Sequence, residues 1–167
     1  MEGQALPRVL AIDPTSRGFG FVVLEGPATL VDWGVRSVPG NHQRTFVGKV
    51  REIIVLYQPD VLVLEDCNAP STRRRHRVRK LIDEVVCTVK GTGLNTYRVS
   101  VRDVRVLFGS NAAKERVATT VAEHFPELAP RLPPKRKIYM SEAERMAIFD
   151  AAAFGLTYYF RTDVGDR

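Results

Sequence analysis

Apolar residues in the first part of the chain fall into short runs that are typical of β-strands. These runs cover residues 8–13, 19–25 and 29–37. Three such runs joined by short turns predict an antiparallel meander. A fourth apolar run, at 61–65, follows a segment with helical spacing, which favours a strand buried on both faces in parallel pairing.

The rest of the chain alternates between helical spacing and short breaks. The predicted helices cover 44–57, from Ser71 or Thr72 to about Lys90, 101–107, 112–124, and from Ser141 to about Phe160. Their apolar residues recur at intervals of three and four. A further short strand is predicted at 95–99, whereas the prolines within 125–140 exclude a continuous helix there. We therefore expect one α/β domain over residues 1–167, with a mixed five-stranded sheet (three antiparallel strands, then two parallel ones) flanked by helices.

Composition narrows the class of protein. Hydrophobic residues make up 44% of the chain, and the longest apolar runs are far too short to span a bilayer. The first eight residues lack the apolar stretch of a signal peptide. The two cysteines indicate neither a disulfide framework nor a zinc site. These features predict a cytoplasmic protein with no membrane association.

Three acidic residues stand beside apolar core segments. Asp13 and Glu65 each close an apolar strand, and Asp150 interrupts the apolar helical segment 146–153. If the two strands are neighbours, both carboxylates meet at one edge of the sheet. A buried carboxylate needs a cation to balance its charge. Several converging carboxylates favour Mg²⁺ or Mn²⁺. Two such ions would activate a water molecule and stabilise the leaving oxygen in phosphodiester cleavage. The alternatives are a turn residue at Asp13, a solvated strand end at Glu65, and an Asp150–Arg145 ion pair.

The segment from Ile12 to Gly20 resembles the opening of the RuvC family of Holliday-junction resolvases, although Thr15 stands where that family usually has glycine. Leu64-Glu65, the segment 101–117, and the segment beginning at Asp150 are similar to later blocks of the family. The blocks occur in the family's order and cover nearly the whole chain. The order of strands and helices also agrees with the ribonuclease H-like fold of that superfamily.

The resemblance implies a metal-dependent endonuclease that binds its metals through Asp13, Glu65 and Asp150. It also implies a homodimer that cuts four-way DNA junctions, with Lys114 near the scissile phosphate. The family usually has a fourth acid one turn before the last one, where this chain has Met146 and Ala147. Glu142 lies about 12 Å away along a regular helix, and Glu144 points to another side. Either glutamate becomes a possible fourth ligand if the start of the helix is distorted.

Basic residues are clustered on a chain with a net charge of +6 and a pI of about 9.6. The two clusters are Arg73, Arg74, Arg75, His76, Arg77, Arg79 and Lys80, and then Lys135, Arg136 and Lys137. A charge run is usually a solvated helix face, but the first cluster follows Glu65 closely. We therefore expect its arginines to flank the acidic site and to bind DNA phosphates. Phe19 is expected in the core, whereas Tyr139 remains a candidate for stacking on a base.

Two other functions are consistent with the same residues. The acids would equally serve a ribonuclease H-like nuclease that acts on an RNA–DNA hybrid or a mobile-element intermediate. The missing fourth acid favours a third possibility, a nucleic-acid-binding scaffold whose catalytic site has decayed.

Overall fold

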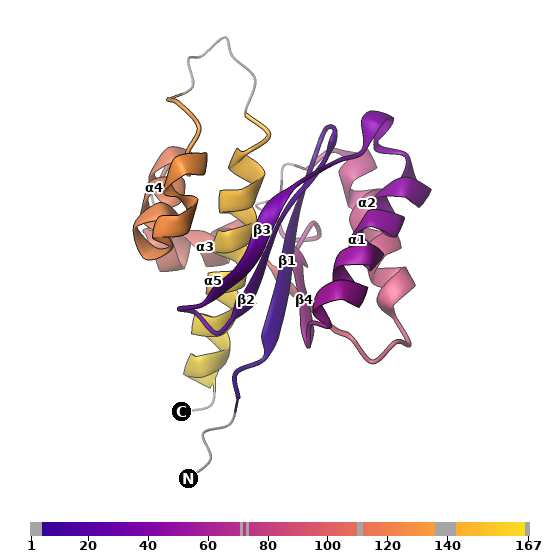
Figure 1. Ribbon diagram of the computed structural model, residues 1–167, viewed down its shortest axis with the longest axis horizontal. Helices are drawn as coiled ribbons and strands as arrows, with labels where there is room; N and C mark the ends of the chain where they lie inside the picture. Colours follow the sequence, from indigo (N-terminus) through magenta and orange to yellow (C-terminus); the bar gives the residue numbers. More distant parts are fainter. Residues whose placement is uncertain (1–4, 71, 73, 110–111, 136–142, 166–167) are drawn as a thin grey trace.

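A five-stranded sheet lies between two layers of helices in the computed structural model, which describes residues 5–70, 72, 74–109, 112–135 and 143–165 (Figure 1). The strands are β1 (Arg8–Thr15), β2 (Gly18–Glu25), β3 (Leu30–Ser37), β4 (Val61–Glu65) and β5 (Asn95–Val99). Their order in the sheet is β3-β2-β1-β4-β5. β1, β2 and β3 pair antiparallel, and β4 pairs parallel with both β1 and β5. The predicted fold class is therefore confirmed.

The helices form two groups on opposite faces of the sheet. The helices are α1 (Gln43–Tyr57), α2 (His76–Val89), α3 (Val101–Phe108), α4 (Lys114–His124) and α5 (Met146–Gly165), with 3-10 turns at Pro39–Asn41 and Pro126–Arg131. α1 and α2 cover one face, and α5 covers the other with α3 and α4 packed beside it (Figure 1). None of the described helices, α5 included, has the length and apolar character needed to cross a membrane.

The predicted helix ends are only partly correct. Ser100 caps α3 through a reciprocal hydrogen-bonded box with Asp103, and the helix ends at Phe108, one residue beyond the predicted range 101–107. The helix expected to start at Ser71 or Thr72 begins only at His76, because Arg75 before it has an extended backbone. The last helix begins at Met146, and the predicted Ser141 cap lies outside the described residues.

Strand alternation sorts the core into two halves. Leu10 and Ile12 of β1 face α1 and α2, whereas Val9 and Ala11 face α5. The same alternation on β4 places Val61 and Val63 on the α5 side. The next residue of each series along β1 and β4 is an acid, so the sheet pattern itself aims both carboxylates at the α5 side.

α5 approaches the sheet closely because small residues face each other. A β-carbon on Gly20 of β2 would overlap the backbone and the β-carbon of Ala147. Gly155 lies similarly close to Leu24. Gly20 also pairs directly with Asp13 across β1 and β2. This glycine therefore sets the distance between α5 and the end of β1 that carries Asp13.

We predict that Gly20→Ala will lower the free energy of unfolding by about 1–3 kcal/mol, because overpacking forces α5 away from the sheet. Gly48→Ala is the matched control, since a β-carbon there meets no atom within 4 Å. Gly48 lies inside α1, so the control is expected to gain about 0.5–1 kcal/mol. Urea denaturation measures both. Unchanged stability in Gly20→Ala would show that α5 does not depend on this contact.

Candidate active site

Two of the three predicted acids meet at one edge of the sheet. β1 and β4 are parallel neighbours, with Ala11 level with Val63. Asp13 and Glu65 lie two residues further on, so their side chains leave the sheet side by side on the α5 face. Each of these residues is only 3% exposed. Two adjacent buried carboxylates repel each other and lose their hydration, so the pair depends on a cation.

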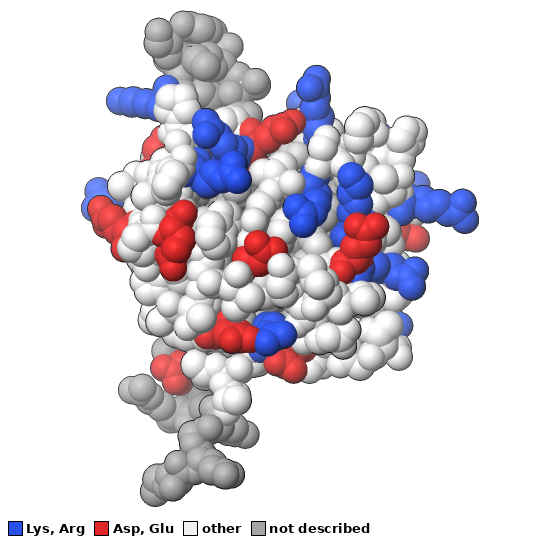
Figure 2. Space-filling model, in the orientation of Figure 1, with Lys and Arg blue, Asp and Glu red and all other residues white. Residues whose placement is uncertain are grey.

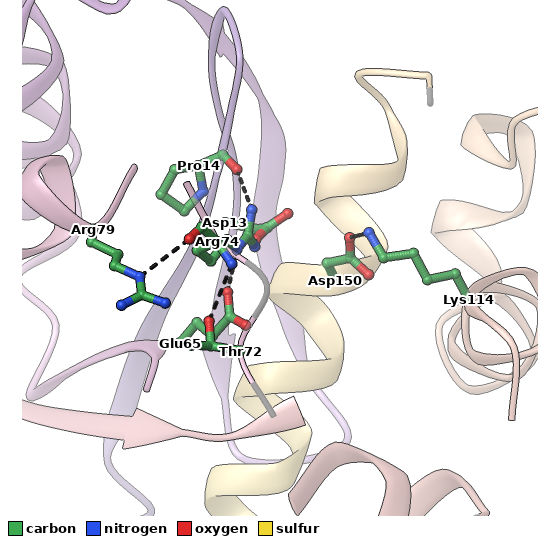
Figure 3. Close-up of polar contacts among 8 residues, drawn as sticks. All are labelled: Asp13, Pro14, Glu65, Thr72, Arg74, Arg79, Lys114 and Asp150. Carbon is green, nitrogen blue, oxygen red and sulfur yellow. Dashed lines mark hydrogen bonds and ion pairs between the residues drawn. The ribbon is translucent and has the colours of Figure 1, made fainter. Parts of the chain in front are cut away.

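The cation in this structure is Arg74. Its Nη2 donates to Oδ1 of Asp13 and its Nε donates to Oε2 of Glu65, so one guanidinium bridges the two carboxylates (Figure 3). Nη1 donates to the carbonyl oxygen of Pro14 at 2.9 Å. The backbone carbonyl of Arg74 accepts from Nε of Arg79 at 3.1 Å. Arg74 is therefore fixed both at its side chain and at its backbone.

Burial and charge act in opposite directions on these groups. Burial raises the pKa of the Asp13 carboxyl above its usual value, and nearby Arg74 and Lys114 oppose that shift. Burial alone would lower the pKa of the Arg74 guanidinium, but Asp13 and Glu65 outweigh it and hold that pKa above its usual value. Arg74 therefore stays charged, and its charge is what makes the buried acids tolerable.

Asp150, the third predicted acid, lies on α5 and forms an ion pair with Lys114 at the start of α4. The Nζ–Oδ2 distance is 2.9 Å, and the side chains are 53% exposed for Lys114 and 13% exposed for Asp150. Figure 3 shows this pair beside the Asp13–Arg74–Glu65 cluster as a second polar group. Arg145, the partner considered from the sequence, lies exposed in the turn before α5.

Both polar groups border one groove of about 440 Å³. Glu65, Arg74, Lys114 and Asp150 contribute its polar side chains together with Arg105. Its apolar lining comes from α3, α4 and α5 and the segment before α4, through Val101, Val104, Ala112, Ala113, Val117, Ala153 and Phe154. The groove thus combines acids, fixed cations and an apolar wall next to the sheet edge.

Asp13, Glu65 and Asp150 have the oxygen ligands of a divalent-ion site, but the three carboxylates are not gathered around one point. Carboxylate oxygens are the ligands that Mg²⁺ and Mn²⁺ prefer, and Asp13 and Glu65 are close enough to share one cation. Within the described part of the chain, however, no three His, Cys, Asp or Glu side chains are gathered so that they could hold a metal ion. Asp13 and Glu65 therefore fit a divalent ion as a pair, and Asp150 stands beside them in its ion pair with Lys114.

The place of a fourth acid is filled by apolar packing. Met146 and Ala147 are 7% and 2% exposed, and Ala147 lies against Gly20, directly across from Asp13. Glu144 is exposed in the turn that precedes α5. Glu142 lies outside the described residues. The described site thus has three acids.

The first basic cluster is divided by the structure. Arg75, His76, Arg77 and Lys80 are exposed, and Arg79 is half-buried. The loop before α2 turns Arg74 into the acidic site, where it flanks the acids as predicted, and DNA binding by this arginine stays a prediction. Nothing in the sequence distinguishes Arg74 from its neighbours, since the path of that loop decides which arginine is buried.

Of the second basic cluster, Lys135, Arg136 and Lys137, the structure describes only Lys135. Lys135 is exposed, while Arg73, Arg136, Lys137 and Tyr139 lie outside the described residues. In Figure 2, Lys and Arg side chains gather over the side formed by α1 and α2, with acidic side chains among them. Phe19 is fully buried against Phe21 and Phe46, as expected of a core residue.

Comparisons with known proteins agree with this architecture. No protein-family model matches the sequence, and no curated protein matches it either. Among solved structures, Thermus thermophilus RuvC is similar with a TM-score of 0.68 and 20% identity over 95% of this chain and 96% of that one. The same RuvC in complex with a Holliday junction substrate gives a TM-score of 0.67 at 20% identity, over 95% and 96% of the two chains.

A more distant solved structure is the yeast mitochondrial Holliday junction resolvase Ydc2. Its TM-score is 0.59 at 12% identity, over 98% of this chain and 82% of that one. The similarity to these proteins extends over nearly the whole chain. The chain therefore has the ribonuclease H-like fold of the RuvC-type Holliday junction resolvases.

Proposed function

We propose that this protein is a metal-dependent endonuclease that cleaves branched DNA such as four-way junctions. The observation that carries the proposal is the burial of Asp13 and Glu65 side by side at the sheet edge, with Asp150 bordering the same groove. A structural role alone does not explain two adjacent buried acids, because apolar residues would stabilise that position at lower cost. A resolvase-like fold around the acids supports the same function.

The proposed cofactor is Mg²⁺ or Mn²⁺, with Asp13, Glu65 and Asp150 as the residues that would hold up to two ions. When bound, such ions activate a water molecule and stabilise the leaving oxygen of a phosphodiester. Lys114 is half-exposed in its ion pair with Asp150, and its proposed role is to hold the scissile phosphate when the substrate binds.

The exposed basic side chains at the start of α2 provide the DNA-binding surface in this proposal. They follow the acidic site in the chain and contribute phosphate contacts that position the substrate without reading its sequence. Cutting two strands of a junction needs two active sites, so the active form is proposed to be a homodimer. Sedimentation of the protein with and without junction DNA tests that assembly.

A catalytically decayed scaffold is the second candidate, and a specific observation favours it. Ala147 replaces the acid expected one turn before Asp150, and Arg74 already forms ion pairs with the other two acids. A nuclease for another nucleic acid is the third candidate. Cleavage assays with Mg²⁺ or Mn²⁺ on four-way junctions, flaps, duplexes and RNA–DNA hybrids separate all three, because a scaffold cuts none and a hybrid nuclease cuts only the last.

Asp13→Asn, Glu65→Gln and Asp150→Asn are each expected to lower junction cleavage by more than about 100-fold, because even residues behind a metal ligand cost 10–100-fold when changed. Junction binding, measured by gel shift in EDTA, should stay within about threefold, because the basic surface that dominates affinity is retained. A variant that folds normally and cuts at the unmodified rate would remove that residue from the ligand set.

Glu144→Gln is expected to leave the cleavage rate within about twofold of the unmodified protein, since an exposed residue in the turn before α5 is not held near the metal. The measurement is the single-turnover rate in Mn²⁺. A large loss, with an unchanged melting temperature, would identify Glu144 as the missing fourth ligand.

The double variant Arg75→Gln/Arg77→Gln is expected to bind DNA more weakly. The slope of the logarithm of the binding constant against the logarithm of salt concentration should become less steep by about 0.9 for each phosphate that the protein no longer neutralises. The control, Arg51→Gln/Lys90→Gln, removes the same charge from the middle of α1 and the C-terminal end of α2, and it should leave the slope unchanged. Fluorescence anisotropy over a range of salt concentrations measures both. Equal slopes for the two double variants would mean that the start of α2 does not contact DNA.

A further inference from the structure

Arg74 has more contacts than a surface arginine needs. Its guanidinium donates to two carboxylates and to the carbonyl of Pro14, and its side chain is only 23% exposed. The two carboxylates come from different strands, whereas Arg74 comes from the loop before α2. The guanidinium therefore lies where the paired oxygens of Asp13 and Glu65 converge (Figure 3).

We infer that Arg74 is the resident cation of the Asp13–Glu65 pair, and that a divalent ion binds these two carboxylates only by displacing it. The inference rests on the proposed metal dependence for the identity of the competing ion. Arg74 is then an internal competitor that lowers the affinity of the two carboxylates for a metal ion.

Charge and geometry both make the competition direct. A planar guanidinium matches carboxylate oxygens with a fixed fork of donors and remains charged at any ordinary pH. Arg74 takes Oδ1 of Asp13 and Oε2 of Glu65, and a divalent ion that bridged the two carboxylates would lie against the charged guanidinium even if it used their other oxygens. The ion and Arg74 therefore compete for the pair, so the apparent metal affinity is reduced to the fraction of protein in which Arg74 has left it.

The number of acids points in the same direction. Arg74, Lys114 and Arg105 of the same groove balance the three carboxylates, so the described residues of the site carry no net charge. Two divalent ions beside these cations would give the site a net charge of four positive units. Because Ala147 stands in place of a fourth acid, the site binds two divalent ions weakly as long as Arg74 occupies the Asp13–Glu65 pair.

The test measures Mn²⁺ binding by the full chain without DNA, using the loss of the free-ion electron paramagnetic resonance signal. Arg74→Gln is expected to bind Mn²⁺ at least about tenfold more tightly than the unmodified protein, because the competitor is gone. Without metal, the same variant should melt at a lower temperature, since two buried carboxylates lose their cation. Mn²⁺ should then raise its melting temperature more than that of the unmodified protein.

Two further variants make the result specific. Arg44→Gln removes one exposed positive charge from α1 and should leave Mn²⁺ affinity unchanged, which accounts for the general effect of charge. Arg74→Gln/Asp13→Asn should lose the gained affinity, which locates the ion at the carboxylate pair. If Arg74→Gln does not fold without metal, Arg74→Lys carries the test, because a single ammonium keeps the charge but cannot reproduce the fork; it should bind Mn²⁺ more tightly than the unmodified protein.

Three results would overturn the inference. Equal Mn²⁺ affinity in the unmodified protein and the Arg74 variants would show that Arg74 does not compete, and measurable binding in both would leave the proposed nuclease intact. A gain that survives Asp13→Asn would place the ion elsewhere. Absence of Mn²⁺ binding in every variant would overturn both the inference and the proposed metal dependence.

Discussion

Two buried carboxylates share one guanidinium at the edge of the sheet, and the arrangement around them follows from that constraint. Asp13 and Glu65 are buried because β1 and β4 are parallel neighbours whose inward positions end in acids. Their charges require compensation in a poorly hydrated place. The loop before α2 supplies it by bringing Arg74 inward, and α2 can then begin only after Arg75.

The same edge is held together from the α5 side. Gly20 allows Ala147 to lie directly against β2, which brings the first turn of α5 over the end of β1. One turn later α5 carries Asp150, whose partner Lys114 begins α4. Elements far apart in the sequence therefore converge on one groove because a glycine and an alanine permit close packing there.

Arg74 bridges Asp13 and Glu65, Lys114 pairs with Asp150, and Arg105 lines the same groove. A site with three acids and three cations is close to neutral before any ligand arrives. Such a site stabilises the fold, but its acids can bind another cation only when Arg74 or Lys114 moves away. A metal-dependent nuclease and a decayed scaffold share this resting structure and differ in whether the internal partner is exchanged.

The sequence by itself determined the strands of the sheet, most of the helices and the acidic residues that close two strands. The apolar runs and the helical spacing are local patterns, since they depend on residues a few positions apart. The position of Asp13 and Glu65 at strand ends predicted that they would meet if their strands were neighbours, and the parallel pairing of β1 with β4 satisfied that condition.

Only the tertiary structure decided which arginine of the cluster turns inward, where α2 begins, and that Lys114 pairs with Asp150. Each of these depends on groups distant in the sequence: Arg74 meets Asp13 across 61 positions, and Lys114 meets Asp150 across 36. In a run of neighbouring basic residues the local pattern is nearly uniform, so local rules assign all of them to the surface. The buried carboxylates bind Arg74, because a desolvated charge is stabilised only by a partner that the fold brings within reach.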